Sequence, residues 1–491
     1  MSKYQTSPLP LETMPPGVPY IIGNEAAERF CFYGMRSILV IYMTTALLDR
    51  QGNLAAVSET TAKEWYHLFV AAMYFFPMVG AIIADALLGK YRTILSLSLV
   101  YCLGCFALAL DQTRLGLFLG LSMIAIGAGG IKSCVSANVG DQFGPRNQHL
   151  LDRVFSWFYF SINFGSFFAT LTMPILFDHF SRSDLYGPNA KHLGPAMAFG
   201  FPGLLMLTAT FIFWLGRKKF VHVPPSGSGL LREAFSRDGA MVIAKLGTLF
   251  LFVAIYTSLY DQGASAWVLQ AKKMDRQIFT WFQPTEEWLV AHGLTVLQGL
   301  SQFQIKPSHI LAVNPMLIMV LIPFCTYLLY PAVGKFVELT PLRKLAGGFF
   351  LMAGAFLIAA YAATLIASSP TPPTVWWQLL AFVVLTMAEV TVNITCLQFC
   401  YTQAPAKMKS LVMGMYMLSW AGGNLFTAAV NYFISRPDGS SRLPGASYYW
   451  FFAGLMLITS LLFCIYAAFY REQNVAIREL DVAEEEAEAV S

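Results

Sequence analysis

Twelve long apolar runs follow one another along this 491-residue chain, each bounded by charged residues, proline or glycine. A helix that crosses the hydrocarbon core of a bilayer needs about 20 apolar residues, so each run is long enough to span it. The chain is therefore predicted to be an all-α integral membrane protein whose solvent is the lipid bilayer. The predicted helices cover approximately residues 21–48, 64–86, 91–111, 114–138, 150–177, 195–216, 241–269, 309–336, 343–368, 374–403, 408–434 and 446–470.

The composition agrees with this class and excludes others. Hydrophobic residues make up 56% of the chain and charged residues only 12%, whereas a soluble domain carries about a quarter charged residues. The net charge of +4 is spread over short loops and offers no basic surface for nucleic acid. All eight cysteines fall inside apolar runs without a metal-ligand motif. They are interpreted as packing residues, and neither a metal nor a cofactor is expected.

Lysine and arginine collect in alternate loops, which share one side of the membrane with both ends of the chain. By the positive-inside rule, both termini are expected in the cytoplasm, which requires an even number of crossings. No cleavable signal peptide is visible, so the first helix is expected to act as the targeting signal. The predicted segments are a cytoplasmic tail (1–20), an N-terminal six-helix bundle (21–216), a cytoplasmic linker (217–240), a C-terminal six-helix bundle (241–470) with an outer-side extension (270–308), and an acidic cytoplasmic tail (471–491).

The first predicted helix carries two acids and two bases inside an apolar run. Glu25 and Glu28 are three residues apart, Arg29 is four residues after Glu25, and Arg36 lies two turns further on, so all four share one face. Ionisable groups inside a membrane cost roughly 3 kcal/mol or more each. A ladder of surface ion pairs is the alternative interpretation, but the flanking residues are too apolar for it. We expect this stripe to face a water-filled cavity.

The fourth predicted helix contains a single base, Lys132. It follows the glycine-rich stretch 127–130, which allows close helix approach. A lysine at that point needs a carboxylate partner, and the nearest candidates are Glu25 and Glu28. Because an ammonium is a compact charge that exchanges partners readily, Lys132 is suited to a switch.

Other ionisable residues stand alone in later helices. Glu389 is a single acid in the tenth helix, opposite the positive charge of the first half. His67 in the second helix is either a structural residue or a proton acceptor, and Asp261 in the seventh is either a gate or a packing residue. Asp85 lies in a loop with Arg92, and we interpret this loop as a charged hinge that holds the inner gate.

Several of these segments together resemble the proton-dependent oligopeptide transporter family of the major facilitator superfamily. The family motif ExxERFxYYG is similar to residues 25–34, and its two signatures are similar to GAGGIKSCVSANVGDQF (127–143) and FYFSINFGS (158–166). FDQxxSxW is similar to YDQGASAW (260–267), and the tenth helix continues into QFCYTQAPAKMKS (398–410). The resemblance covers essentially residues 20–470. It implies a major facilitator fold with twelve transmembrane helices in two six-helix bundles.

The resemblance also implies roles for individual residues. Four groups follow from it: a proton-coupling cluster (Glu25, Glu28, Arg29, Lys132 and His67), receptors for the peptide carboxylate (Arg36 and Lys132), receptors for the peptide ammonium (Glu389, Asn163 and Asn314), and pocket walls (Tyr33, Tyr74 and Trp267). The predicted gate residues are Asp85, Arg92 and Asp261.

The chain also departs from the family pattern. The eighth helix offers no charged partner for the acid on the seventh, so the family's outer-gate salt bridge is not predicted. The connection 217–240 is too short for the extra helix pair of many bacterial members, and the connection near 368–374 lacks the large outer domain of mammalian ones. These features favour a bacterial inner-membrane protein with a plain twelve-helix plan, and we expect a monomer.

The predicted function is proton-coupled import of di- and tripeptides by alternating access, with the substrate between the two halves. A transporter of another small solute, such as nitrate or a peptide-like drug, is the main alternative. A membrane enzyme is disfavoured because the helices carry no Ser/His/Asp or metal constellation. A channel or receptor is disfavoured by the titratable cluster and the two-half plan.

Overall fold

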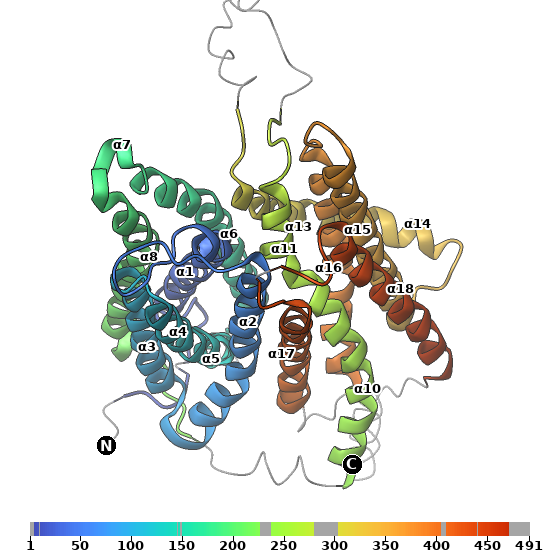
Figure 1. The fold of residues 1–491 in the computed structure, drawn as a ribbon. Helices are drawn as coiled ribbons and strands as arrows, with labels where there is room; N and C mark the ends of the chain where they lie inside the picture. Colours follow the sequence, from blue (N-terminus) through green and yellow to red (C-terminus); the bar gives the residue numbers. More distant parts are fainter. Residues whose placement is uncertain are drawn as a thin grey trace, which may run out of the picture.

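The computed structural model describes residues 4–8, 10–144, 146–147, 150–225, 237–278, 303–403, 409–438 and 440–470. Within these residues the chain forms twelve long helical segments in two bundles (Figure 1). The N-terminal bundle contains α1 (Val18–Thr45), α2 (Glu59–Ile83) with η1 (Ala84–Leu88), α3 (Lys90–Leu110), α4 (Arg114–Ile124) with η2 (Ala125–Gly129) and α5 (Gly130–Gly140), α6 (Leu151–Phe180) and α8 (Ala190–Leu215). The C-terminal bundle contains α10 (Arg237–Tyr260) with η6 (Asp261–Ala264) and α11 (Ala266–Ala271), η8 (Pro307–Ala312) with α13 (Val313–Phe324), η9 (Cys325–Leu329) and α14 (Tyr330–Gly334), α15 (Pro341–Ser368), α16 (Trp376–Gln403), α17 (Lys409–Ile434) and α18 (Ala446–Phe469). Short helical turns are α7 (Ser183–Tyr186), η4 (Gly187–Asn189) and η5 (Gly216–Lys218).

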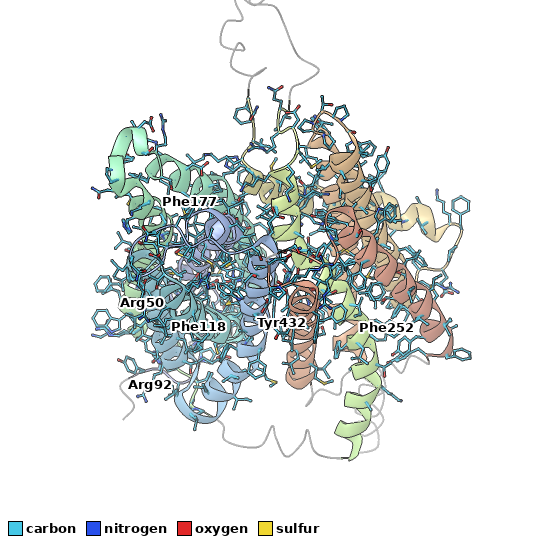
Figure 2. All side chains as sticks on the ribbon, viewed as in Figure 1. Arg50, Arg92, Phe118, Phe177, Phe252 and Tyr432 are labelled. Carbon is cyan, nitrogen blue, oxygen red and sulfur yellow. The ribbon has the colours of Figure 1, made fainter. Side chains whose placement is uncertain are left out.

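The predicted all-α membrane fold is confirmed, with small shifts at the helix ends. Nine helical segments of the described residues are long and apolar enough to cross a membrane by length and composition. Large apolar side chains such as Phe118 and Tyr432 are exposed on the outside of the bundles, where lipid would cover them (Figure 2). α1 begins at Val18, earlier than predicted, because Pro19 fits the first turn of a helix.

Some predicted segments lie outside the described residues. These are most of the extension 270–308, part of the linker 217–240 and the whole tail 471–491.

Glycines hold the helices of the N-terminal bundle in close contact. A Cβ atom on Gly80 of α2 would lie 1.9 Å from the carbonyl oxygen of Gly130, which begins α5. A Cβ atom on Gly165 of α6 would lie 2.6 Å from the carbonyl oxygen of Ala26 on α1. Small residues let helix backbones approach in this way. The close approach predicted for the stretch 127–130 is confirmed, because its glycines contact α2 and α3.

Each bundle has its own hydrophobic core, and the two bundles meet along a few helices. α2 packs along α17, while α6 contacts η8 and α1 contacts α11. Within the C-terminal bundle, Gly423 of α17 approaches α10 so closely that a Cβ atom there would lie 2.2 Å from the carbonyl oxygen of Ala254. We call the end of the molecule where α1 begins and α18 ends the terminal end, and the opposite end, where α2 begins, the far end.

A break in one long helix places polar groups between the bundles. α10 ends at Tyr260, the chain continues as the 3₁₀ turn η6, and α11 starts only after Ser265, whose φ and ψ are −128° and −86°. Asp261, Gln262 and Ser265 all lie in this break and are fully buried. Buried polar groups need partners, and the neighbouring helices α1, α2 and α17 supply several of them.

The Gly80–Gly130 contact gives a first testable prediction. Gly80→Ala places a methyl group against the backbone of α5, which has no side-chain freedom to move aside. We expect a loss of about 1–3 kcal/mol in the free energy of unfolding, measured by denaturant titration in detergent micelles.

The matched control is Gly354→Ala on α15, where the nearest atom to a new Cβ is a methyl carbon of Val384 at 3.9 Å. This variant is expected to keep or slightly raise the stability, since alanine favours helices over glycine. Equal losses in the two variants would show that the close approach of α2 and α5 does not limit stability.

Candidate functional site

A cavity with an empty volume of about 470 Å³ lies between the two bundles. α1 and α6 form its wall on the N-terminal side, and α10, η6, η8, α13 and α16 form its wall on the C-terminal side. Its polar and aromatic lining consists of Tyr33, Arg36, Ser166, Thr170, Tyr260, Asn314 and Phe382.

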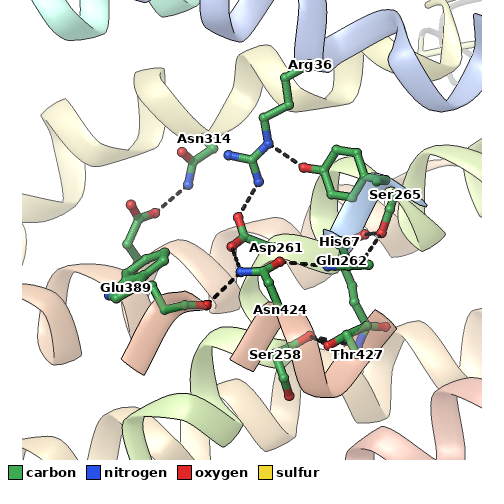
Figure 3. Close-up of polar contacts among 12 residues, drawn as sticks. Arg36, His67, Ser258, Asp261, Gln262, Ser265, Asn314, Glu389, Asn424 and Thr427 are labelled. Carbon is green, nitrogen blue, oxygen red and sulfur yellow. Dashed lines mark hydrogen bonds and ion pairs between the residues drawn. The ribbon is translucent and has the colours of Figure 1, made fainter. Parts of the chain in front are cut away.

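Arg36 links the two bundles on one side of this cavity. Its guanidinium forms an ion pair with Asp261 of η6 and donates a hydrogen bond to the Tyr66 hydroxyl on α2. Asp261 is fully buried and accepts a second hydrogen bond from Asn424 Nδ2 of α17 at 2.7 Å. The ion pair is therefore buried, hydrogen-bonded at both ends and shared between α1 and η6 (Figure 3). A salt bridge from the seventh helix is thus present, although its partner is on the first helix rather than the eighth.

The network continues from Asp261 to the buried ring of His67. Asn424 Oδ1 lies 2.7 Å from His67 Nδ1, and His67 Nε2 lies 2.9 Å from Ser265 Oγ (Figure 3). Because the amide nitrogen of Asn424 already donates to Asp261 and to the carbonyl of Trp420, its oxygen is the acceptor for His67. We therefore assign the proton of the neutral ring to Nδ1, so that Ser265 donates to Nε2.

Glu389 lies on the opposite bundle, next to the cavity. It belongs to α16 and is half-buried, and its Oε2 accepts a hydrogen bond of 2.6 Å from Asn314 Nδ2. The same amide nitrogen lies 3.1 Å from the hydroxyl of Thr386. In Figure 3, Asn314 lies between Glu389 and Arg36, and both Asn314 and Arg36 line the cavity. The site thus offers a base from one bundle and an acid from the other.

The predicted cluster on α1 forms as a compact group of buried charges. Arg29 Nε lies 2.7 Å from Glu25 Oε1 and 2.8 Å from Glu28 Oε2. All three side chains are buried, yet neither carboxylate oxygen of Glu28 makes a well-aligned hydrogen bond with a described residue. One guanidinium therefore serves two carboxylates, which leaves one negative charge in excess.

Lys132 does not form an ion pair with any described residue in this structure. Its ammonium lies 4.2 Å from the centroid of the Tyr74 ring, and that ring packs against Trp420 of α17 at 5.0 Å. Glu25 and Glu28 pair with Arg29 instead, so the exchange between these glutamates and Lys132 stays a prediction. Lys132 lies within the protein at the interface of the two bundles, not against lipid.

Not every predicted pocket residue lines the cavity. Tyr33 and Asn314 do, whereas Trp267 is fully buried in the core of the C-terminal bundle and packs against Phe356 and Phe382. Tyr74 contacts Lys132 instead, and Asn163 is buried on α6. The roles predicted for these residues stay predictions.

The sequence reasoning missed several polar residues of the network. Tyr66, Ser265 and Asn424 each bond directly to a predicted site residue. A signal for one of them exists in the sequence, because Asn424 follows the glycines of SWAGGN inside an otherwise apolar helix. A lone amide there is costly unless it has a partner.

The predicted inner gate lies at the terminal end. Arg92 is exposed near the start of α3 (Figure 2), and the side chain of Asp85 lies outside the described residues. The nearby ion pair between Lys90 and Asp141, 2.7 Å long, ties the start of α3 to the end of α5. The gate role of Asp85 and Arg92 therefore stays a prediction.

Two helical bundles around a charged cavity, with nine membrane-compatible helical segments in the described part of the chain, define a multi-pass membrane transporter of the major facilitator type. The POT family model matches residues 91–237 and 283–451. The chain belongs to the POT family and is therefore a transporter rather than an enzyme.

Individual relatives agree with this assignment. The chain is 35% identical over 386 residues to "Peptide transporter family 1" of Drosophila melanogaster, which covers 70% of this chain and 47% of the relative. It is 34% identical over 394 residues to "Solute carrier family 15 member 2" of Homo sapiens, with 70% and 48% covered. The chain thus spans about half the length of these curated relatives.

A solved structure covers the fold more completely. "In meso crystal structure of the POT family transporter PepTSo" matches with a TM-score of 0.77 and 33% identity, over 93% of this chain and 98% of that chain. "Crystal structure of auto inhibited POT family peptide transporter" matches with a TM-score of 0.76 and 32% identity, over 94% and 98%.

The Arg36–Asp261 ion pair can be tested with a double-mutant cycle of Arg36→Met and Asp261→Asn. Each single change leaves a buried charge without its partner, so both are expected to destabilise strongly. The double variant is expected to be more stable than the sum of the single losses implies, with a coupling free energy of about 1–3 kcal/mol. The measurement is denaturant unfolding in detergent micelles.

The exposed pair Arg182–Asp184 serves as the control for this cycle. Its side chains are 56% and 61% exposed, so its coupling free energy is expected to be only about 0–1 kcal/mol. A coupling of zero between Arg36 and Asp261 would refute the interaction between the bundles.

Proposed function

We propose that this protein is a proton-coupled symporter that imports di- and tripeptides by alternating access. The observation that carries the proposal is the cavity between the bundles, which has Arg36 on one wall and the Asn314–Glu389 pair on the other. A zwitterionic peptide carries a carboxylate and an ammonium at opposite ends, so it matches this pattern of charge. The printed names of the relatives, "Peptide transporter family 1" and "peptide transporter", point to the same class of substrate.

The peptide is held at its two ends in this proposal. Its carboxylate binds Arg36 and Lys132, and its ammonium binds Glu389 with Asn314. Charge-assisted hydrogen bonds of this kind are roughly twice as strong as neutral ones. Because the two receptors belong to different bundles, a bound peptide draws the bundles together, and the receptors also set an upper limit on peptide length.

The Arg36–Asp261 pair couples proton uptake to carboxylate binding. A proton that arrives at His67 Nε2 gives an imidazolium, which is linked to Asp261 through Asn424 and offsets its negative charge. The Ser265 hydroxyl then accepts from Nε2 and turns its own proton toward the Gln262 carbonyl, 3.5 Å away. Arg36 is thereby released from Asp261 and takes the peptide carboxylate.

A second proton site lies at Glu25 and Glu28. The cluster carries excess negative charge, and Glu28 has no well-aligned hydrogen bond from any residue that the structure describes. Glu28 is therefore the better proton acceptor of the two. When Glu28 is neutral, Lys132 is free to bind the substrate. Loss of the proton restores a carboxylate that attracts Lys132 and displaces the peptide.

The transport cycle takes place in a bacterial inner membrane, with both termini in the cytoplasm and a monomer as the working unit. In this orientation the Arg36–Asp261 pair closes the outer side of the cavity. One proton crossing a potential of 100 mV supplies about 2.3 kcal/mol, and each pH unit adds about 1.4 kcal/mol. Protons are the coupling ions, and no cofactor takes part.

The alternative substrates fit the cavity less well. A lone anion such as nitrate can bind Arg36 or Lys132. It has no positively charged group to bind Glu389, so the half-buried carboxylate of Glu389 would have no role in binding nitrate. Peptide-like drugs that keep both charged ends fit the same receptors as peptides. Uptake of dialanine into proteoliposomes, with and without an imposed pH gradient, distinguishes these classes of substrate.

Glu389→Gln tests the ammonium receptor. The variant keeps the size and the bond to Asn314 but loses the charge, so dialanine binding is expected to weaken roughly 10–100-fold. N-acetyl-dialanine, which has no ammonium, is expected to be affected less than threefold. The measurement is inhibition of labelled-peptide uptake in proteoliposomes, with the exposed Glu338→Gln as the control variant. Equal losses for the two peptides would refute the role of Glu389.

Glu28→Gln tests proton coupling at the cluster on α1. The variant cannot exchange a proton at this site, so accumulation driven by a pH gradient is expected to fall at least tenfold. Counterflow exchange of peptide across the membrane needs no net proton movement and is expected to persist.

Glu25→Gln and His67→Asn are measured in the same two assays. They show whether the other members of the network carry the proton or only hold the structure. Gradient-driven accumulation that survives in all three variants would place proton coupling elsewhere in the protein.

A further inference from the structure

A second cavity lies at the far end of the molecule, away from the cavity that contains Arg36. It has an empty volume of about 600 Å³, and α2 forms its wall on the N-terminal side. The wall on the C-terminal side comes from α11, α15, the 441–445 loop and the start of α18. Three of its lining residues are charged, namely Glu59, Lys63 and Lys273.

The charges of this cavity do not balance. Glu59 Oε2 and Lys273 Nζ form an ion pair of 2.9 Å between the two bundles, with both side chains about half exposed. Lys63 is then the remaining charge, so the lining carries a net charge of +1. Among the described residues, Lys63 has no carboxylate in ion-pair contact.

Lys63 is a buried cation without a carboxylate in ion-pair contact in the described part of the chain. Its side chain is only 8% exposed, and its ammonium lies 3.6 Å from the centroid of the Tyr448 ring. A cation–π contact compensates only part of the cost of burying an ammonium group. The Lys63 ammonium has three N–H donors, and the face of the Tyr448 ring is only a weak acceptor for them. An anion beside Lys63 would accept hydrogen bonds from these donors and would therefore be stabilised.

The surrounding groups also favour an anion. The cavity lies at the N-terminus of the 25-residue helix α2, where backbone N–H groups and the helix dipole favour negative charge. The side chain of Thr60 lines the same space and offers a hydroxyl donor. A carboxylate has two oxygens, which match the ammonium and the hydroxyl.

We propose that this far-end cavity is a second binding site, which takes the carboxylate of a small organic acid such as the C-terminus of an acylated amino acid. Lys63 is the cationic receptor and Thr60 provides a hydroxyl donor. Aromatic and apolar residues of the cavity, among them Tyr448, Tyr449 and Leu443, surround the rest of the ligand. Because both bundles contribute walls, an occupant stabilises the arrangement in which they touch at this end.

The test measures the apparent melting temperature of the purified full chain in detergent, with N-acetylalanine as the probe. N-acetylalanine is expected to raise the melting temperature with saturation, whereas its uncharged amide and equimolar sodium chloride are not. Lys63→Met is expected to raise the half-saturating concentration about tenfold or more, and Lys63→Arg to change it little. Lys63→Gln serves as a second neutral variant in case the Met variant does not fold.

The matched control is Lys272→Met, which removes the same charge from an exposed lysine nearby that does not line the cavity. Its response to N-acetylalanine is expected to equal that of the unaltered chain. An unchanged response in the neutral Lys63 variants would place the carboxylate at the cavity of Arg36 and overturn the proposal. Equal loss in Lys272→Met, equal stabilisation by chloride, or no stabilisation at all would overturn it as well.

Discussion

The structure depends on one ion pair, between Arg36 of the first helix and Asp261 of the seventh. Both side chains are buried between the bundles, where each charge alone would be costly and the pair together is only a modest stabiliser. Such a pair constrains the relative position of the two bundles more than it adds to the stability of the protein. Separation of the bundles at this point requires a new partner for each charge, so bundle movement is tied to the arrival of other charges.

The sequence predicted the charged residues of α1 because their partners are local. Glu25, Glu28 and Arg29 are three or four residues apart, and helical periodicity alone brings them together. The partner of Arg36 is 225 residues away, and no periodicity relates the two positions. The contact depends on how the two bundles are arranged, so the sequence alone is compatible with both a gate role and a packing role for Asp261.

The fold, too, could be predicted from the sequence only where it depends on local features. Apolar runs located the helices because lipid demands continuous apolar surface and fully paired backbone groups. They did not reveal that α10 breaks at η6 or that Ser265 interrupts the helix, since these breaks depend on partners from other helices. The polar network that includes Asn424 and His67 forms at this break. Local hydrophobicity therefore gave the scaffold, and tertiary contacts determined the chemistry of the site.

The close contact of α2 with α5 at Gly80 and Gly130 has a consequence for studies of motion. Two backbones in direct contact leave no room for sliding, so these helices move as a single body through any rearrangement of the transporter. The distance between two spectroscopic labels, one on α2 and one on α5, is therefore expected to stay constant and would serve as a control. Changes in label distance between α2 and α17 would then report the relative movement of the two halves without a contribution from deformation within the first.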